Sequence, residues 1–576
     1  MIEKMTKYSF ILLKGEETKF LEQLRELGVL DIKRSSVPVD EHSTDLLERI
    51  GQVKHEISLL ENGFDAHLEE LLTMRDSLEK AEEVIAPWGE YDRSKAQELD
   101  RAGVPMHFYC VRQKEFDPAW AEDYPLEVVC EDGKKVHFVI PGDVSGFPVT
   151  ELNSPMYTLK ELKAHIDYKD KEIERYRHNL EARKDEIPGL EKREAELTGE
   201  LNLYLAAKAG ESAVDDRITV FEGFAPTDTD ARLAEVLDSS EALWIKDKAT
   251  KEDNPPISYK NNWFTRQFEV LTDMYGRPAY DEFDPTPILG PFFLLFFAMC
   301  MGDAGYGLLL MLIGWLLQRK PGSSMARLGP LVVMLGVGTF VVGIVLHTFF
   351  GINLYTAGWV PDWLKSCMIS GSIAGYDAQM VLAIGVGVFH ICLAMVVKAI
   401  CFTSRFGFAK SISTWGWTTL IVGSIITGGL ALLGVIDTPV VKVILIVLGI
   451  VSGLGIFILN DLHRNPLLNI GSGLWDTYNT ATGLMGDVLS YLRLYALGLA
   501  GGMLGNTFNY LAGMSLGMHV PGLNYLLFAF ILIIGHVLNL ALSCLGAFVH
   551  PLRLTFVEYF KNSGYEGTGR TYRPLK

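Results

Sequence analysis

The most unusual residue of this sequence is an arginine deep inside an apolar segment. Arg493 lies within Gly486–Leu497, itself part of a Gly- and Ala-rich apolar stretch from Gly471 to Ala512. A guanidinium does not shed its proton in a protein, and placing one at the centre of a membrane helix costs about 3 kcal/mol on insertion scales. Because Arg493 is too far from either end to snorkel easily, it needs a partner or a water-filled cavity. Ionisable groups at such depth mark ion paths, and we favour that interpretation over a topology-setting arginine.

A second set of polar groups follows one face of the last apolar segment. Its members are spaced 3, 4, 7 and 3 residues apart: His536, Asn539, Ser543, His550 and Arg553. That spacing puts them on one side of a helix, where they must face protein, water or both. Hydrogen bonding between helices is one interpretation, and a water-filled path beside a second buried arginine is the one we favour. Neither arginine has an obvious anionic partner in the sequence, so we expect the carboxylate to come from another subunit.

Six further polar groups are isolated within apolar runs: Asp303, Tyr306, His347, His390, Asp476 and Asp487. We expect each of them to be satisfied by structural hydrogen bonds. The sequence has no phosphate-binding GxxxxGK[ST] loop, no GxGxxG after a strand, no HExxH and no GxSxG. The seven cysteines form no CxxC pair and are interpreted as free thiols. We therefore predict no catalytic ATP site, no cofactor and no metal ion on this chain.

The composition separates two regions. The chain has 576 residues, a formal net charge of −18 and a mean hydropathy of +0.18. Residues 1–280 are charged and polar, whereas residues 288–560 are almost continuously apolar, in runs long enough to span a bilayer. The first residues lack the apolar segment of a signal peptide, so we predict a cytoplasmic domain at 1–280 and a polytopic membrane domain at 281–576. The acidic balance argues against binding to nucleic acid.

The cytoplasmic region is predicted to be a mostly helical, stator-like arm. Heptad spacing over Leu46–Phe64, and again after residue 156, indicates two long helices paired as an antiparallel coiled coil, with a kink at Pro188. Short strands between them, such as His107–Val111 and Lys135–Ile140, indicate a compact head. The expected parts are proximal α/β patches at 1–40 and 212–250, coiled-coil arms at 41–86 and 157–211, and a distal head at 87–156. Whether the arms are a passive spacer or a lever that docks partners stays open.

The membrane domain is predicted to cross the bilayer eight times. Its apolar runs lie at about 288–302, 303–318, 328–350, 379–402, 412–435, 439–459, 471–512 and 523–560. The first two are short and meet at Gly302–Gly305, either as one kinked span or as a tight hairpin. Cationic side chains gather in alternate loops and in the tail: Arg319, Lys320, Arg327, Arg405, Lys410, His463, Arg464, Arg570, Arg573 and Lys576. Since positive loops stay in the cytoplasm, we choose the hairpin, eight spans and two cytoplasmic termini, with two long tilted helices at the end of the domain.

Six motifs in order resemble those of one family over the whole chain. They are Glu222–Pro226, Tyr280–Pro287, Gly302–Gly307, Ser490–Leu497, Phe548–Phe560 and Gly564–Pro574. Together they are similar to the membrane subunit a, also called subunit I, of rotary V-type and archaeal-type (V/A) ATPases. Gly501 and Ser543 stand where eukaryotic relatives carry a histidine and an acid, which fits a prokaryotic member.

The resemblance implies a function in ion translocation. Arg493 would be the essential arginine and Arg553 its helper, both facing a rotor ring of c subunits that each carry an ion-binding carboxylate. Candidates for two aqueous half-channels are His550, Ser543, Asn539, His536, Asp487, Ser490 and Glu558. Peripheral stalk subunits would bind residues 1–280. The chain would lie in the inner (cell) membrane of a prokaryote and couple translocation of H⁺, or of Na⁺, to ATP hydrolysis or synthesis.

Two functions from other classes compete with this interpretation. A stand-alone secondary ion transporter would use the intramembrane polar groups, but it predicts an internal repeat, and none is visible in the sequence. A membrane tether without transport would explain the coiled-coil arms and leave the buried arginines without a purpose.

Overall fold

The computed structural model describes residues 2–35, 37–63, 65–89, 93–131, 133–144, 147–152, 158–213, 217–240, 242–319, 328–358, 360–373, 375–432, 434–458, 466–517 and 523–575. The seam residue Phe64 and the loop cations Lys320, Arg327, His463, Arg464 and Lys576 lie outside these ranges. The chain forms two compact units. The hairpin unit comprises residues 35–205, and the main unit comprises residues 1–34 and 206–576.

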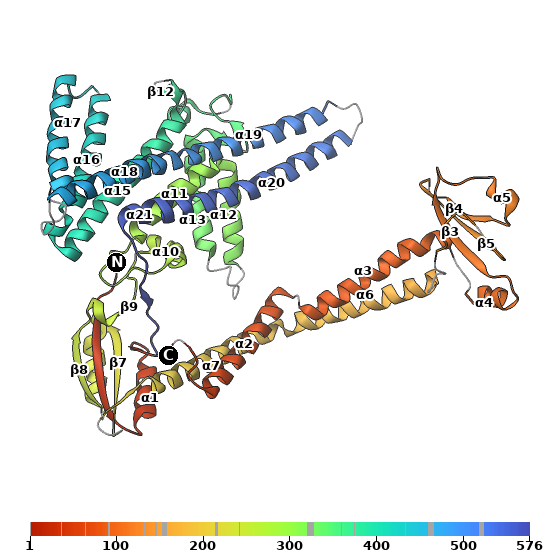
Figure 1. Ribbon diagram of the computed structural model, residues 1–576, viewed down its shortest axis with the longest axis horizontal. Helices are drawn as coiled ribbons and strands as arrows, with labels where there is room; N and C mark the ends of the chain where they lie inside the picture. The colour runs from red at the N-terminus through yellow and green to blue at the C-terminus, as the bar shows by residue number, and fades with distance from the viewer. Residues whose placement is uncertain are drawn as a thin grey trace. The chain divides into compact units, whose positions relative to one another are not determined.

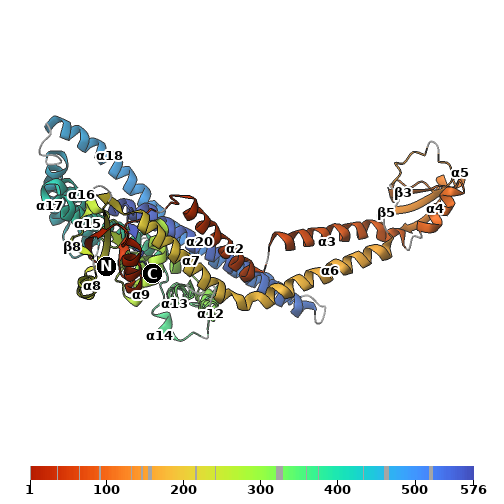
Figure 2. The same ribbon diagram turned by 90° about the horizontal axis from the view of Figure 1, so that it is seen from below.

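The hairpin unit is built on two antiparallel helical arms. The arms consist of α2 (Glu41–Asn62) and α3 (Ala66–Ile85), then α6 (Leu159–Ala182), a 3-10 turn (Arg183–Glu186) and α7 (Ile187–Lys208). The heptad positions are buried as a seam in which Leu46, Ile50, Val53 and Ile57 pack against Leu197, Leu201 and Leu205. Figures 1 and 2 both show α3 and α6 side by side. The apolar repeat therefore forms the contact between the arms.

The first arm is not the single long helix that the heptad pattern predicts. α2 ends at Asn62 and is followed by Gly63, whose φ of 63° is left-handed and suits a residue without a Cβ. The Asp65 side chain then accepts a hydrogen bond from the Leu68 amide and starts α3, and the Tyr176 hydroxyl of the other arm donates to Asp65 at 2.5 Å. In the second arm, Pro188 stands in the first turn of α7, directly after the 3-10 turn.

A small sheet ends the arms. Its strands lie in the spatial order β3 (Met106–Arg112), β5 (Lys135–Pro141) and β4 (Glu127–Glu131), all antiparallel. Short helices accompany it: a 3-10 turn (Ala86–Trp88), α4 (Arg93–Arg101) and α5 (Trp120–Asp123). Aromatic rings fill its core, where Phe138 contacts Tyr109, Phe116 and Phe147. Alternating apolar residues thus close a head of three strands.

The main unit begins with a five-stranded sheet. Its strands are β2 (Asp31–Ile32), β7 (Ile218–Pro226), β1 (Met5–Leu13) and β8 (Leu243–Lys248) in spatial order, with β6 (Glu211–Ala213) also paired to β7. Two helices and two 3-10 turns accompany the sheet: α1 (Glu17–Leu27), α8 (Asp230–Asp238), Thr227–Thr229 and Lys251–Asp253. β1 is antiparallel to both neighbours. Two segments on either side of the hairpin unit in sequence therefore form one sheet, because the antiparallel arms return the chain to its starting point.

Within the described residues of the main unit, four helices are long and apolar enough to cross a bilayer: Ala378–Phe406, Thr438–Ile458, Asn469–Ser515 and Leu523–Ser563. Three shorter apolar helices precede them: α11 (Thr286–Met301), α12 (Ala304–Gln318) and α13 (Gly329–Val345). The four long helices correspond, in order, to α15 (Ala378–Phe406), α17 (Thr438–Gly453), α18 (Pro466–Ser490) with α19 (Leu492–Ser515), and α20 (Leu523–Arg553) with α21 (Phe560–Ser563). Other helices of this region are α9 (Trp263–Arg266), α10 (Glu269–Tyr275), α14 (Asp362–Lys365) and α16 (Phe408–Leu432). Short hairpins lie between α13 and α15: β10 (Thr348–Phe349), β11 (Ile352–Asn353), β12 (Ser372–Ile373) and β13 (Tyr376–Asp377).

The chain reverses between α11 and α12. α11 ends at Met301 and is followed by Gly302, whose φ of 60° allows a sharp turn, and Asp303 caps α12. Pro291 near the start of α11 and Gln318 at the end of α12 line the same surface hollow, so the two helices run in opposite directions. At about 1.5 Å per residue, α11 measures about 24 Å, somewhat less than the ~30 Å core of a bilayer.

The C-terminal tail returns to the first sheet. Its strand β14 (Arg570–Thr571) pairs in parallel with β9 (Pro256–Ile257). The Arg573 amide donates to the Asp31 carboxylate at 3.1 Å, and the Leu575 amide donates to a backbone carbonyl beside it. Burial raises the pKa of the Asp31 carboxyl. The tail therefore connects the last membrane helix to the sheet at the other end of the chain.

Candidate functional site

The two membrane arginines stand beside the two irregular points of the longest helices. Tyr491 interrupts the helix between α18 and α19, and Arg493 is the second residue of α19. α20 ends at Arg553 and continues directly as a π-helical segment, Leu554–Tyr559. Short π segments inside α-helices occur frequently at functional sites. Figure 1 shows α19 and α20 side by side, so the irregular points belong to one helix pair.

The Arg493 guanidinium has a buried nitrogen, Nη1, without a hydrogen-bond partner among the described residues. His550, on α20, lies within electrostatic reach of both Arg493 and Arg553, and its buried Nδ1 atom likewise finds no partner in the described ranges. Arg553 itself is exposed. A buried guanidinium nitrogen without an acceptor is costly, so this site is incomplete in the isolated chain.

A first hollow lies beside the residues of α19 that follow Arg493. This first hollow has a volume of about 260 Å³ and is walled by the turn after α11, by the segment between α13 and α15, and by Leu494, Tyr495 and Gly498 of α19. Its polar lining includes His347 and Asp377. Tyr495 donates to the Asp377 carboxylate at 3.4 Å. A polar hollow of this size has room for several water molecules.

A second hollow lies on the other side of Arg493. It has a volume of about 340 Å³ and is lined by residues of α15, α16, α18 and α21, among them Lys398, Asp476 and Asp487. The Asp487 carboxylate accepts a hydrogen bond from Asn562 at 2.8 Å and lies 3.6 Å from the Lys561 ammonium. Arg493 thus stands in the chain between Asp487, which lines the second hollow, and Leu494, which lines the first.

Glu558 and Ser490 connect the two irregular points. Glu558 lies in the π-helical segment, is 2% exposed, and has one carboxylate oxygen without a partner among the described residues. The Ser490 hydroxyl, the last of α18, is within hydrogen-bonding reach of that carboxylate, and Arg553 acts on it electrostatically. The sequence therefore underestimated the anionic groups near Arg553, since Glu558 is buried in the π-helical segment that follows it.

The polar stripe of α20 divides into two parts. In its first part, His536 bonds through one ring nitrogen to the Tyr306 hydroxyl at 2.8 Å and through the other to Asn509 at 3.0 Å. Asn539 donates to the Tyr306 hydroxyl and to the Gly501 carbonyl at 2.8 and 2.9 Å. Ser543 donates to Asn539 at 3.3 Å. His536 and Asn539 therefore bond to other helices and Ser543 bonds within α20, whereas the buried Nδ1 atom of His550 in the second part has no partner among the described residues.

The isolated polar groups have different environments. The Asp303 carboxylate accepts four backbone amides, those of Gly305, Tyr306, Phe350 and Gly351, at 2.7–3.3 Å. These bonds make Asp303 a structural residue, as the sequence predicts. His390 is bonded to Tyr491 at 2.9 Å. His347 and Asp476 line the first and the second hollow respectively.

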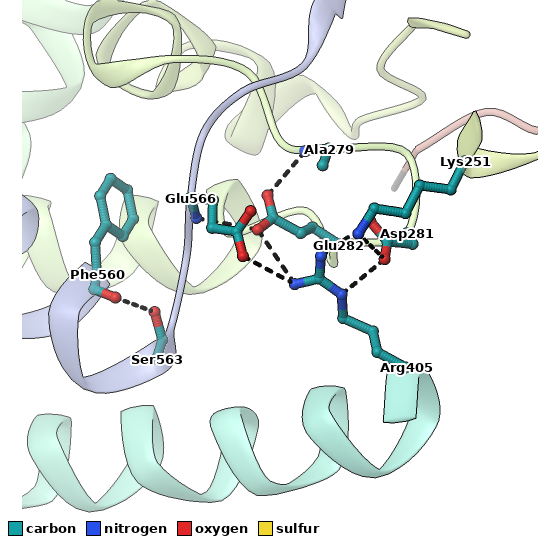
Figure 3. Close-up of polar contacts among 8 residues, drawn as sticks. All are labelled: Lys251, Ala279, Asp281, Glu282, Arg405, Phe560, Ser563 and Glu566. Atoms are coloured by element: carbon teal, nitrogen blue, oxygen red, sulfur yellow. Dashed lines mark hydrogen bonds and ion pairs between the residues drawn. The ribbon is translucent and has the colours of Figure 1, made fainter. Parts of the chain in front are cut away.

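An ion cluster that sequence reasoning missed lies at the end of α15. Figure 3 shows Arg405 pointing toward three carboxylates. Its guanidinium lies 2.7 Å from Asp281, 3.6 Å from Glu282 and 3.7 Å from Glu566, and its side chain is 6% exposed. Burial raises the pKa of the Asp281 carboxyl, but hydrogen bonds from Lys251 and Arg405 outweigh burial and hold that pKa below its usual value. We read Arg405 only as a loop cation, because nothing in the sequence places the tail beside residues 281–282.

Comparison with known proteins gives a consistent result. Residues 149–354 match the V-type ATPase 116 kDa subunit family. The chain is 28% identical to the A-type ATP synthase subunit I of Methanocaldococcus jannaschii over 85% of this chain and 71% of that protein. It is 32% identical to the A-type ATP synthase subunit I of Pyrococcus horikoshii over 56% of this chain and 48% of that protein.

The similarity extends to bacterial relatives over the full length. The V-type ATP synthase subunit I of Borreliella burgdorferi is 24% identical and aligns with 100% of this chain and 99% of its own length. The archaeal and bacterial relatives carry the same subunit name, and the family match covers both the second arm and the first membrane helices. This membrane protein therefore belongs to the V-type ATPase 116 kDa subunit family.

Proposed function

We propose that this chain is the static membrane subunit of a rotary V/A-type ATPase or ATP synthase, and that it conducts H⁺, or Na⁺, past a rotor ring of c subunits. The observation that carries the proposal is Arg493, whose buried Nη1 atom has no partner among the described residues and which stands between two polar hollows. A carboxylate on a neighbouring subunit would complete this site. The names of the relatives, subunits I of ATP synthases, support the same assignment.

In this mechanism the two hollows belong to two half-channels that do not meet. The first hollow is bounded by the segment between α13 and α15, which is poor in cations, and we assign it to the half-channel on the side opposite the cytoplasm. The second hollow is bounded by α15, α16 and α21 near Arg405 and Lys410, and we assign it to the cytoplasmic half-channel. An ion would leave one hollow, bind a ring carboxylate, travel with the ring and be released to the other.

Arg493 has two tasks in this scheme. Its fixed positive charge favours the ionised, unloaded form of the passing carboxylate. It also repels cations and so prevents a leak between the half-channels. A loaded, neutral ring site can face lipid, whereas an ionised one cannot do so cheaply. His550 and Arg553, on the neighbouring helix, would shape the field around the same site.

The remaining parts are assigned by the same reasoning. The hairpin unit would bind peripheral stalk subunits and keep the chain from turning with the ring. The ATP sites would lie on other subunits of the complex, and this chain would have eight spans in the inner (cell) membrane of a prokaryote with both termini in the cytoplasm. We propose no cofactor or metal on this chain, and the described residues contain no group of three or more His, Cys, Asp or Glu arranged to hold a metal.

The experiment that tests the proposal is the pair Arg493→Lys and Arg553→Lys in the complete complex. Both variants keep the positive charge, but lysine can lose its proton when desolvated and lacks the planar two-point grip on a carboxylate. We expect Arg493→Lys to assemble and to lose at least about 95% of ATP-driven ion uptake into vesicles, and Arg553→Lys to keep a measurable part. This loss, a drop in rate of about twentyfold or more, corresponds to an activation free energy higher by roughly 1.8 kcal/mol or more.

Subunit content on a gel is the control for assembly. Uptake near the wild-type rate in Arg493→Lys would mean that charge alone suffices and that the central step is wrong. Ion transport by the purified chain without other subunits would instead favour a secondary transporter.

A further inference from the structure

His390 of α15 is a buried polar side chain that the proposed mechanism does not use. It is 1% exposed and surrounded by aromatic rings. Its ring stacks on Tyr559 at a centroid distance of 4.7 Å and an interplanar angle of 8°. Phe292 and Phe296 of α11 contact it at 4.3 and 5.1 Å. The site has the shape of an aromatic box with one imidazole inside it.

The imidazole also makes one specific polar contact. Its Nδ1 atom and the Tyr491 hydroxyl are joined by a hydrogen bond of 2.9 Å. Tyr491 is fully buried. Gly387, one helical turn before His390, lets the two elements approach closely, because a Cβ at this position would lie 2.2 Å from the Tyr491 ring. The close approach and the hydrogen bond together hold the Tyr491 ring against α15.

The two partners of His390 belong to the two irregular points described above. Tyr491 is the residue that separates α18 from α19, two positions before Arg493. Tyr559 is the last residue of the π-helical segment that follows Arg553. One side chain of α15 therefore contacts both the break in the α18–α19 helix and the π segment of α20.

A purely structural purpose explains the position poorly. The Nε2 atom of His390 is buried and has no hydrogen-bond partner among the described residues. Leaving a polar atom unpaired in a buried site costs free energy, and the hydrogen bond to Tyr491 uses only one of the two ring nitrogens. Residues that break a local rule of packing in this way are expected at functional or strained sites.

We propose that His390 is a positioning residue that connects Tyr491 to Tyr559 through its own ring and thereby holds Arg493 in register with His550 and Arg553. The inference rests on the proposed function, since it concerns how precisely Arg493 meets a passing carboxylate. A guanidinium displaced by about 1 Å would still carry its charge, but it would no longer be aligned with the carboxylate of the passing ring subunit. The expected defect is therefore slippage, in which ATP is hydrolysed and fewer ions are moved.

The test compares His390→Phe, Tyr491→Phe and the double variant in the complete complex reconstituted into vesicles. The readout is the number of ions taken up per ATP hydrolysed, which changes in a positioning defect and not when a smaller number of intact complexes is present. We expect each single variant to lower this ratio at least about threefold. The double variant should fall no further than either single variant, because all three remove the same hydrogen bond.

Two further variants sharpen the result. His390→Asn keeps a polar atom near the position of Nδ1 and should retain at least about half of the wild-type ratio. Phe389→Leu changes the neighbouring residue on the exposed face of α15, where the side chain is 61% exposed, and should leave the ratio unchanged. If His390→Phe does not assemble, Tyr491→Phe removes the same bond by deleting a single oxygen and gives the same measurement.

The outcomes separate this inference from the proposed function. A wild-type ratio in His390→Phe or in Tyr491→Phe, or a double variant whose loss is the product of the single losses, would overturn the positioning assignment. Arg493→Lys measured in the same vesicles reports on the mechanism itself. If Arg493→Lys is inactive while the His390 variants are normal, only the positioning assignment fails.

Discussion

The two parts of the polar stripe on α20 have the same periodicity and opposite environments. In the first part, both ring nitrogens of His536 have partners, and Asn539 bonds to two other elements. In the second part, the Nδ1 atom of His550 and the nearby Nη1 atom of Arg493 are buried without partners among the described residues. The first part therefore joins helices within the chain, and the second part retains unused hydrogen-bonding capacity, as the proposed function requires.

The comparison teaches that a polar stripe in a membrane helix is not one functional unit. A saturated group contributes to stability and is unavailable for ion transfer, whereas an unsaturated one is available at a cost in stability. Variants of the first part should thus change stability and leave transport per assembled complex intact. Variants of the second part should lower transport per assembled complex and leave stability nearly unchanged. Four substitutions, one at Asp303 beside the first part and three within the stripe, test this division from the largest expected effect to the smallest.

The largest effect is expected for Asp303→Ala, which removes the acceptor of four backbone amides next to Tyr306. Hydrogen bonds to a charged group contribute about 1.5–3 kcal/mol each, so the loss should exceed about 3 kcal/mol. We expect poor assembly and a marked drop in the temperature at which the detergent-solubilised complex aggregates. The exposed Asp362→Ala is the control. Normal heat resistance in Asp303→Ala would contradict the structural assignment.

A smaller loss is expected for Asn539→Leu. The change removes donors to Tyr306 and to the Gly501 carbonyl and leaves both acceptors buried. Hydrogen bonds between membrane helices contribute about 1–2 kcal/mol at most, so we expect a measurable drop in the same aggregation temperature. Uptake divided by the amount of assembled complex should stay within about twofold of wild type, with Leu538→Ala as the matched control. A specific loss of uptake with unchanged stability would place Asn539 in an ion path.

His550→Ala is expected to have the opposite signature. Its Nδ1 atom has no partner among the described residues, so little stability should be lost. The imidazole is within electrostatic reach of two guanidinium groups, and we expect ATP-driven uptake to fall about three- to tenfold, since water can replace part of a lost side chain in a hydrated path. The exposed neighbour Val549→Ala should transport normally. Destabilisation without a transport defect would remove His550 from the second part of the stripe.

The smallest effect is expected for Ser543→Ala, at the boundary of the two parts. Its bond to Asn539 is 3.3 Å long and the residue is half-buried, so removal should change stability by less than about 0.6 kcal/mol. Uptake should fall less than about twofold. A complete loss of uptake with intact assembly would instead place Ser543 in the second part of the stripe.

Local sequence patterns predicted many of the elements. The heptad positions Leu46 and Leu201 are buried in the contact between the arms, and the alternating strands around Tyr109 and Phe138 form the head. Such patterns can be recognised in a sequence because the spacing of the buried side chains follows from the geometry of a single helix or strand. The break at Gly63 was missed, although a glycine followed by Asp65 is a weak signal of a helix end and a new helix start.

Contacts between distant segments were not predictable in this way. Nothing in the sequence pairs Arg405 with Asp281 and Glu566, and nothing brings the tail strand to β9. The π turn after Arg553 is equally invisible, because its hydrogen-bond pattern depends on how α20 packs. Pro551 marks only a disturbance nearby.

The sequence by itself determined which side chains are too polar for their surroundings, because placing an arginine such as Arg493 among apolar residues has a cost that needs no structure to recognise. It also determined the mostly helical character and the division into a charged and an apolar region. Only the tertiary structure decided which polar groups are saturated. Hydrogen bonds and ion pairs are short-ranged, so whether His536 or His550 finds a partner depends on which atoms of other helices come within about 3 Å.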